Sequence, residues 1–207
     1  MKTVHIEFIS DFICPWCYLG KARLERVQQL LAPDIQLDIE VKPFLLYPHI
    51  PKGGVHKSHF AKKTKPGMGR SLRKEAEIEG IKISYRNIEF IPYSMEAHRL
   101  VWLVEDKQQK YDLAMRLFYG YFEEGQNLED HTYLSEQATL SGVPSAIIEQ
   151  FKSTEAGLAA CENYIQDAKD NFVNLVPTLK LNHKFTVLGL QSADVLEKYI
   201  RRAAAKM

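Results

Sequence analysis

Apolar and polar residues alternate in the first part of the chain as they do in β-strands. Residues 3–9 alternate Val, Ile and Phe with polar residues, and residues 35–41 repeat this pattern. Between the two runs, residues 18–32 place four leucines and a valine near one face of a helix, and Pro33 lies beyond its end. The order strand, helix, strand predicts a βαβ unit with parallel strands.

The C-terminal part contains a second alternating pattern. Residues 178–181 and 185–188 form two short runs, and Asn182 and His183 occupy the turn between them, which predicts a β-hairpin. Ser192 is a good N-cap for a helix that continues towards the C-terminus.

Between these two parts, the apolar spacing from about residue 70 to 170 is mostly helical. Without that block, a βαβ–ββα order is left, which is the plan of thioredoxin. We therefore predict an α/β, thioredoxin-like fold with a large α-helical insertion. The expected thioredoxin-like domain comprises residues 1–48 and 172–207, and the insertion, a basic loop followed by a helical domain, comprises residues 49–171.

The composition fits a globular chain that is stable without disulfides. Its 207 residues are 45% hydrophobic and 26% charged, and three cysteines are too few for a disulfide framework. The net charge of +1 argues against a nucleic-acid partner. The basic residues are unevenly placed, since residues 52–74 hold eight Lys or Arg and no acidic residue. This stretch is either a solvated loop, which we favour, or a surface that steers acidic substrates.

The sequence gives no sign of a membrane partner. The N-terminal run is interrupted by polar residues, unlike a secretory signal, and no run of about 18 apolar residues occurs. We predict a cytoplasmic protein, a compartment in which a C-x-x-C pair is more often catalytic or metal-binding than structural.

The candidate chemistry lies in the motif Cys14-Pro15-Trp16-Cys17, where the first predicted strand passes into a helix. Unpaired N–H groups and the helix dipole at such a position favour a negatively charged sulfur. Pro15 suits the first helical turn because its missing N–H is not needed there. Cys14 is therefore expected to be the accessible, attacking thiol, and Cys17 the more buried thiol that resolves a mixed disulfide. An exposed Trp16 would be explained by contact with a substrate, and we expect Pro15 and Trp16 to belong to the substrate-binding residues.

Other interpretations of the pair are weaker. A zinc site needs four ligands and the motif supplies two, so we predict no metal site. Two inert core cysteines are a further alternative. Cys161 lies on an apolar helical stripe, which favours core packing over a regulatory role. A structural, hydrogen-bonded role is favoured for His98, and the direction of the Asp11 side chain is open.

In a thioredoxin plan, the loop before the third core strand faces the C-x-x-C motif. That loop holds Val176 and Pro177 here. A cis bond between them would turn the backbone of Val176 towards an incoming peptide, but only about 5–6% of X–Pro bonds are cis.

Several segments resemble the FrnE-like branch of the DsbA-type thioredoxin-fold oxidoreductases. They are "SDFICPWCYLG", "PFLLYPHIPKGG", "SMEAHRL", "LFYGYFEEGQNL" and "VPTLKLNHKFTVLGLQ", which are spread over most of the chain. The resemblance implies a dithiol–disulfide oxidoreductase in which Cys14 is the nucleophile, Cys17 the resolving thiol, and Val176 with a cis Pro177 the substrate platform. Leu175 and Leu190 depart from the family pattern, and a reshaped substrate groove is expected from Leu175.

Two rival functions are kept. Kappa-class glutathione transferases and 2-hydroxychromene-2-carboxylate isomerases look similar overall, but they typically carry serine at the position of Cys14. A glutathione-dependent transferase or isomerase is therefore the first alternative, and a non-enzymatic binding module is the second. The expected partner is a protein or small molecule that contains a disulfide or thiol. No bound cofactor is expected beyond the two cysteines, and glutathione is left open as a co-substrate.

Overall fold

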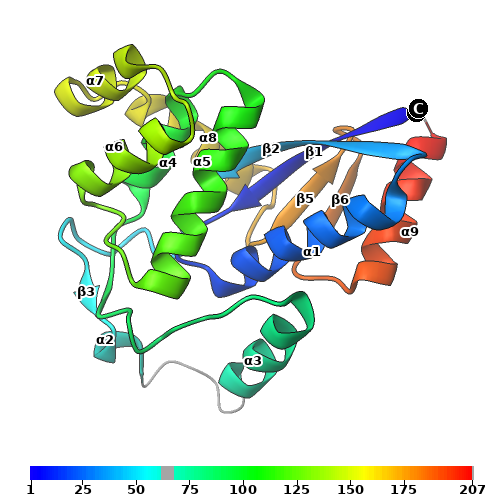
Figure 1. Cartoon of the computed structure of the whole chain (residues 1–207), viewed down its shortest axis with the longest axis horizontal. Helices are drawn as coiled ribbons and strands as arrows, with labels where there is room; N and C mark the ends of the chain where they lie inside the picture. The colour runs from blue at the N-terminus through cyan, green and yellow to red at the C-terminus, as the bar shows by residue number, and fades with distance from the viewer. Residues whose placement is uncertain (62–67, 207) are drawn as a thin grey trace.

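The computed structural model describes residues 1–61 and 68–206, and a mixed sheet forms its centre (Figure 1). In the described part of the chain, this sheet has four strands in the order β2-β1-β5-β6. The strands are β1 (Lys2–Ser10), β2 (Ile35–Pro43), β5 (Thr178–Leu181) and β6 (Phe185–Leu188). β1 is parallel to β2 and antiparallel to β5, and β5 and β6 form an antiparallel hairpin.

The alternation in β1 separates two faces of the sheet. Val4, Ile6 and Phe8 are buried on one face, while His5 and Glu7 lie on the other. Helices α1 (Pro15–Leu31) and α9 (Ala193–Ala205) contact each other, and both pack against the sheet (Figure 1). The hydroxyl of Ser192 accepts a hydrogen bond from the backbone N–H of Val195, which caps α9 as the sequence predicted.

The segment between β2 and β5 is mainly helical and includes a small hairpin. Helices α4, α5 and α8 contact β2, and α3 packs against α1 (Figure 1). The elements of this segment are β3 (Val55–His56), α2 (Ser58–Ala61), α3 (Met68–Glu79), β4 (Phe90–Ile91), α4 (Met95–Leu103), α5 (Lys107–Tyr119), the π-helical turn η1 (Gly120–Glu124), α6 (His131–Leu140), α7 (Ser145–Ser153) and α8 (Leu158–Asp170).

The basic stretch 52–74 differs from the expected loop. Its first part contains β3, which pairs with β4, and its last part lies in α3. The ammonium group of Lys57 donates to the carbonyl of Tyr85 at 3.0 Å, which anchors this side chain while it keeps its charge. Residues 62–67 lie outside the described residues. The boundaries proposed for the insertion, 49 and 171, stay a prediction.

The described helices include none with the length and apolarity that a membrane span requires.

Candidate active site

Cys14 is the N-cap of α1, directly after the turn that follows β1. Its backbone N–H donates to the carbonyl of Asp11 at 3.0 Å, and its carbonyl accepts from the N–H of Cys17 at 3.0 Å. Pro15 begins the helix, where its missing N–H leaves no bond unmade. The Cys14 side chain makes no capping bond to the helix. Its Sγ is therefore available to another partner.

That partner is the loop before β5. The thiol of Cys14 donates to the carbonyl oxygen of Val176, with 3.8 Å between the two atoms. The Val176–Pro177 peptide bond is cis. Gly20 lets this loop approach α1, because a Cβ at Gly20 would lie only 3.2 Å from Cγ of Pro177. The structure thus brings Cys14, Val176 and Pro177 together, as the sequence predicted.

Cys17 lies one helical turn after Cys14 and is fully buried. Burial raises the pKa of the Cys17 thiol well above its usual value, and a hydrogen bond with Cys14 and the charge of that neighbour add to the rise. Both cysteines are free thiols in this structure. The protonated form of the Cys17 thiol is therefore favoured in this structure.

The expectation that Cys14 is accessible was wrong for this conformation, since the residue is only 2% exposed. Its sulfur faces the Val176 carbonyl. Tyr47 and Tyr85, in the segment after β2, are close enough to Cys14 for a charge on its sulfur to affect their pKa values. Burial, and after it the charge of Cys14, raises the pKa of Tyr47 and raises that of Tyr85 to about 12. The Cys14 residue is therefore almost closed off from solvent in this structure.

A buried carboxylate lies beneath the motif. The Asp11 side chain points inwards, where Oδ2 accepts from the N–H of Leu46 at 2.6 Å and Oδ1 from the N–H of Ile13 at 3.3 Å. Nε2 of His98, on α4, lies 3.4 Å from Asp11 Oδ1, and its ring packs on Phe12. Nε2 of His98 is buried without a hydrogen-bond partner, so the hydrogen-bonded role expected for His98 is not seen at this nitrogen. Through its contacts with Asp11 and Phe12, His98 connects the helical segment to the C-x-x-C turn.

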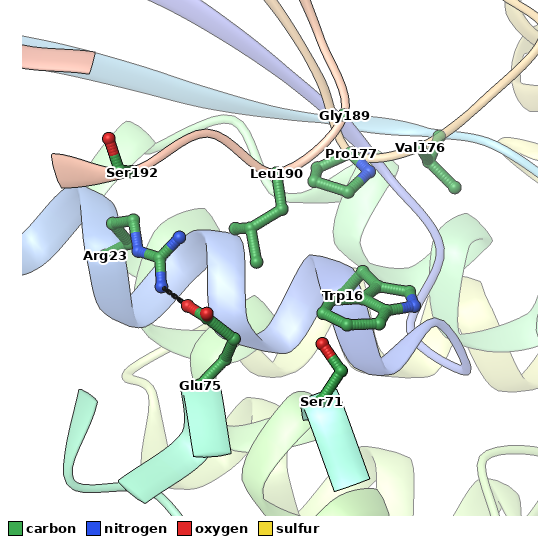
Figure 2. A pocket seen from close by; sticks show the side chains of 9 residues that line it. All are labelled: Trp16, Arg23, Ser71, Glu75, Val176, Pro177, Gly189, Leu190 and Ser192. Carbon is green, nitrogen blue, oxygen red and sulfur yellow. Dashed lines mark hydrogen bonds and ion pairs between the residues drawn. The ribbon is translucent and has the colours of Figure 1, made fainter. Parts of the chain in front are cut away.

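A pocket of about 460 Å³ opens beside Trp16 (Figure 2). Trp16 and Arg23 come from α1, Ser71 and Glu75 from α3, and Pro177 with Leu190 from the loops that flank the β5–β6 hairpin. Trp16 is only partly buried, and Val176 also lines the pocket. Trp16, Val176 and Pro177 thus form part of one surface, which lies next to Cys14.

Comparison with known proteins assigns the chain to a family. The model of the DSBA-like thioredoxin domain matches residues 5–201, which is nearly the whole chain. The chain belongs to the DSBA-like thioredoxin domain family. This confirms the thioredoxin-like fold class and the resemblance to DsbA-type proteins.

Individual relatives agree with the family. The uncharacterized protein YwbO of Bacillus subtilis is 26% identical over 199 residues, which cover 96% of each chain. A probable DsbA oxidoreductase from Streptomyces coelicolor has a similar structure, with a TM-score of 0.84, 22% identity and coverage of 99% of this chain and 91% of that one. A 2-hydroxychromene-2-carboxylate isomerase aligns with a TM-score of 0.75 and 19% identity over 98% of this chain and 97% of that one. The two solved structures show a shared fold.

In this DSBA-like chain, one group of the pocket wall was missed from the sequence. The Arg23 guanidinium donates to Glu79 Oε1 at 2.7 Å, to Glu75 Oε2 and to the carbonyl of Gln191. This buried network fixes α3 against α1 and against the loop after β6. Arg23 lies between two other charged residues of α1, Lys21 and Glu25, so its burial has no local sequence signal.

Cys161 lies apart from the motif, among buried Leu45, Met95 and Ile165. Burial raises the pKa of its thiol to about 12. Core packing of Cys161, the interpretation favoured from its helical phase, is confirmed.

Proposed function

We propose that this chain is a thiol–disulfide oxidoreductase that exchanges disulfides through Cys14 and Cys17. The observation that carries the proposal is the placement of the Cys14 sulfur at a helix N-terminus, 3.8 Å from the Val176 carbonyl, with the buried Cys17 one turn away. The family supports an oxidoreductase of DsbA type. Assignment to the FrnE-like branch, and activity towards protein disulfides in particular, are part of the proposal.

The proposed reaction has two exchanges. The Cys14 thiolate attacks one sulfur of a substrate disulfide, that S–S bond breaks, and the released substrate sulfur leaves as a thiolate that takes up a proton. Cys17 then loses its proton and attacks the Cys14 sulfur of the mixed disulfide. The second substrate thiol leaves and the Cys14–Cys17 disulfide forms. The substrate gains two electrons from the dithiol, and the same steps in reverse oxidise a dithiol substrate.

The roles of the neighbouring residues follow from their positions. Pro15 begins the helix that carries both cysteines, where its missing N–H leaves no bond unmade. Trp16, Val176 and Pro177 offer apolar contacts and a backbone carbonyl next to the sulfur, so we assign them to substrate binding. The two electrons given to the substrate come from the Cys14 and Cys17 thiols, so the reaction as written uses no bound cofactor. Glutathione enters the proposal as a co-substrate that reduces the Cys14–Cys17 disulfide back to two thiols.

The test is to trap the mixed disulfide. Cys17→Ser removes the resolving thiol, so the full chain should accumulate a covalent adduct when it is mixed with a disulfide substrate such as oxidised glutathione or a scrambled protein. Mass spectrometry would locate the adduct at Cys14. Cys14→Ser is the matched control, and it should form no adduct, because burial raises the pKa of Cys17, whereas the Cys14 sulfur contacts Val176 at the edge of the surface formed by Trp16, Val176 and Pro177. Equal labelling of both variants would refute the assignment of roles.

The similarity to a 2-hydroxychromene-2-carboxylate isomerase supports a second candidate, a glutathione-dependent isomerase or transferase on the same scaffold. This candidate predicts saturable binding of reduced glutathione and an activity that survives Cys17→Ser. The two-cysteine motif favours the oxidoreductase, because isomerisation has no use for a resolving thiol. Glutathione binding without any Cys14–Cys17 redox couple would favour the isomerase.

A further inference from the structure

A cluster of metal-ligating side chains lies on the sheet, away from the cysteines. His5 and Glu7 are two residues apart on β1 and therefore point to the same face of the sheet. His183, in the turn between β5 and β6, lies beside them. Each of the three offers one ligand atom, and these atoms lie within 4.8 Å of one another. The fold thus joins residues that are 178 positions apart in the sequence.

The histidine turn is held in place by the backbone of β1. The side-chain oxygen of Asn182 accepts from the N–H of His5 at 2.9 Å, and the N–H of Asn182 donates to the His5 carbonyl at 2.8 Å. Asn182 and His183 have positive φ angles of 50° and 56°, which the tight turn requires. The position of His183 is therefore fixed by the hairpin, while its side chain remains 67% exposed.

Neighbouring groups orient the other two side chains. Nδ1 of His5 lies 3.1 Å from Asp38 Oδ2, the arrangement in which a carboxylate fixes an imidazole and leaves its other nitrogen for a metal. That second nitrogen, Nε2, lies 3.9 Å from Glu40 Oε2. The Tyr164 hydroxyl donates to Glu7 Oε2 at 3.4 Å, which leaves Oε1 to face His183.

The neighbouring carboxylates are already neutralised by lysines. Lys107 contacts Asp38 at 2.7 Å and Lys42 contacts Glu40 at 2.6 Å. Glu7 instead has two imidazole rings beside it, whose centroids are 4.8 Å apart. A single ion pair explains the contact of 2.9 Å between His183 and Glu7. It does not explain why a second imidazole, oriented by its own carboxylate, lies against the same pair.

We propose that His5, Glu7 and His183 form a binding site for a divalent transition-metal ion such as Zn²⁺. Two imidazoles and one carboxylate are a common set of three zinc ligands, with a fourth position left for water. At Zn–N distances of about 2.0–2.1 Å, the ligand atoms of a tetrahedral site lie about 3.3 Å apart. The cluster must therefore contract by up to about 1.5 Å, and the exposed His183 side chain can supply this movement.

The site is separate from the cysteine pair. At a rise of about 3.3 Å per residue, β1 alone places about 17 Å between His5 and Ser10, beyond which the motif begins. A metal ion here would cross-link β1 to the β5–β6 hairpin, both of which lead to the candidate active site. The inference does not depend on the proposed redox function.

Zinc titration of the full chain tests the proposal. The titration uses a Cys14→Ser/Cys17→Ser background, because a C-x-x-C pair can itself bind Zn²⁺. Isothermal calorimetry should give one Zn²⁺ per chain with a Kd of about 10 µM or tighter. The background chain loaded with Co²⁺ should show the visible absorption of a low-coordinate site, and Zn²⁺ should raise its thermal midpoint.

The variants separate a built site from general surface binding. In this background, His183→Ala should weaken Zn²⁺ binding at least about tenfold, and Asp38→Asn, which acts through His5, should weaken it by a similar factor. His183 is exposed in its turn, so the variant should fold. His49→Ala removes another exposed histidine and should leave the Kd unchanged. A Kd weaker than about 100 µM, or the same Kd in His183→Ala as in its parent, would overturn the proposal.

Discussion

Arg23 gives the sharpest test of how the helical segment is attached to the helix that carries the cysteines. Its side chain is 5% exposed and donates to Glu79, whose side chain is 1% exposed, at 2.7 Å. Arg26 reaches the same Glu79 oxygen at 3.1 Å, but its side chain is 41% exposed. One buried carboxylate therefore has a buried and an exposed arginine partner. Arg23→Met and Arg26→Met remove each charge in turn while keeping a long apolar side chain.

The two substitutions should differ in cost. Removing the buried partner leaves Glu79 poorly compensated and the Gln191 carbonyl unpaired, which typically costs about 3–5 kcal/mol. At about 2–4 °C per kcal/mol for a chain of this size, the thermal midpoint should fall by about 6–20 °C. Removing Arg26 should cost about 1 kcal/mol or less, because water screens an exposed ion pair.

Urea unfolding followed by circular dichroism measures both free energies. Adding Glu79→Met to Arg23→Met should recover part of the loss, because the uncompensated carboxylate is then gone. The coupling energy from this cycle isolates the pair. Equal, small losses for Arg23→Met and Arg26→Met would refute the argument that burial makes the Arg23–Glu79 contact the stronger one.

Three further predictions test other parts of the structure. With its pKa raised to about 12, the Cys161 thiol should be ionised in a fraction of only about 10⁻⁴ at pH 8, against roughly a quarter for an ordinary thiol. Iodoacetamide should therefore label Cys161 about 10³-fold more slowly than free glutathione, as followed by peptide mass spectrometry. Equal labelling rates would contradict the burial of Cys161. Burial works against ionisation of Glu96, but Arg99 and His131 outweigh it and hold its pKa below the usual range. Since the folded-state pKa is depressed, this stabilisation is present above the unfolded pKa of about 4.3 and is lost as pH falls through the folded-state pKa. Glu96→Gln should therefore lower the thermal midpoint at pH 7 and have little effect on it near pH 3. An equal effect on the thermal midpoint at both pH values would contradict this reasoning. Gly120→Ala should lower the free energy of unfolding measured in urea, because the added Cβ would overlap the Tyr133 hydroxyl, even though alanine is usually favoured over glycine in a helix by about 1 kcal/mol. Gly69→Ala is the control, because a Cβ at Gly69 meets nothing within 4 Å. A stabilised Gly120→Ala would contradict this packing.

The parts of the fold with regular periodicity were predictable from the sequence. The run predicted as a strand over residues 3–9 is β1 (Lys2–Ser10), because every second side chain faces the core formed with α1 and α9. The hairpin turn lies at Asn182 and His183, as predicted. β3 and β4 were missed because two-residue strands are too short to show alternation.

The candidate site was predictable in its composition but not in its surroundings. The motif and the loop before β5 meet because the strand order brings the two segments to one end of the sheet. The low exposure of Cys14, the inward direction of Asp11 and its contact with His98 depend on packing between distant segments. The contact of Arg23 with Glu79, and that of His5 and Glu7 with the hairpin turn, also depend on such packing. In the sequence, these polar and charged residues look like ordinary surface residues.

The most direct test of the proposed function is the reduction potential of the Cys14–Cys17 couple, titrated in glutathione redox buffers. The proposal predicts a reversible two-electron couple that is absent in Cys14→Ser. A potential near about −120 mV would identify an oxidant of disulfide formation, and one near about −270 mV a reductase. If no reversible couple forms and both thiols alkylate independently at ordinary rates, the oxidoreductase assignment is wrong.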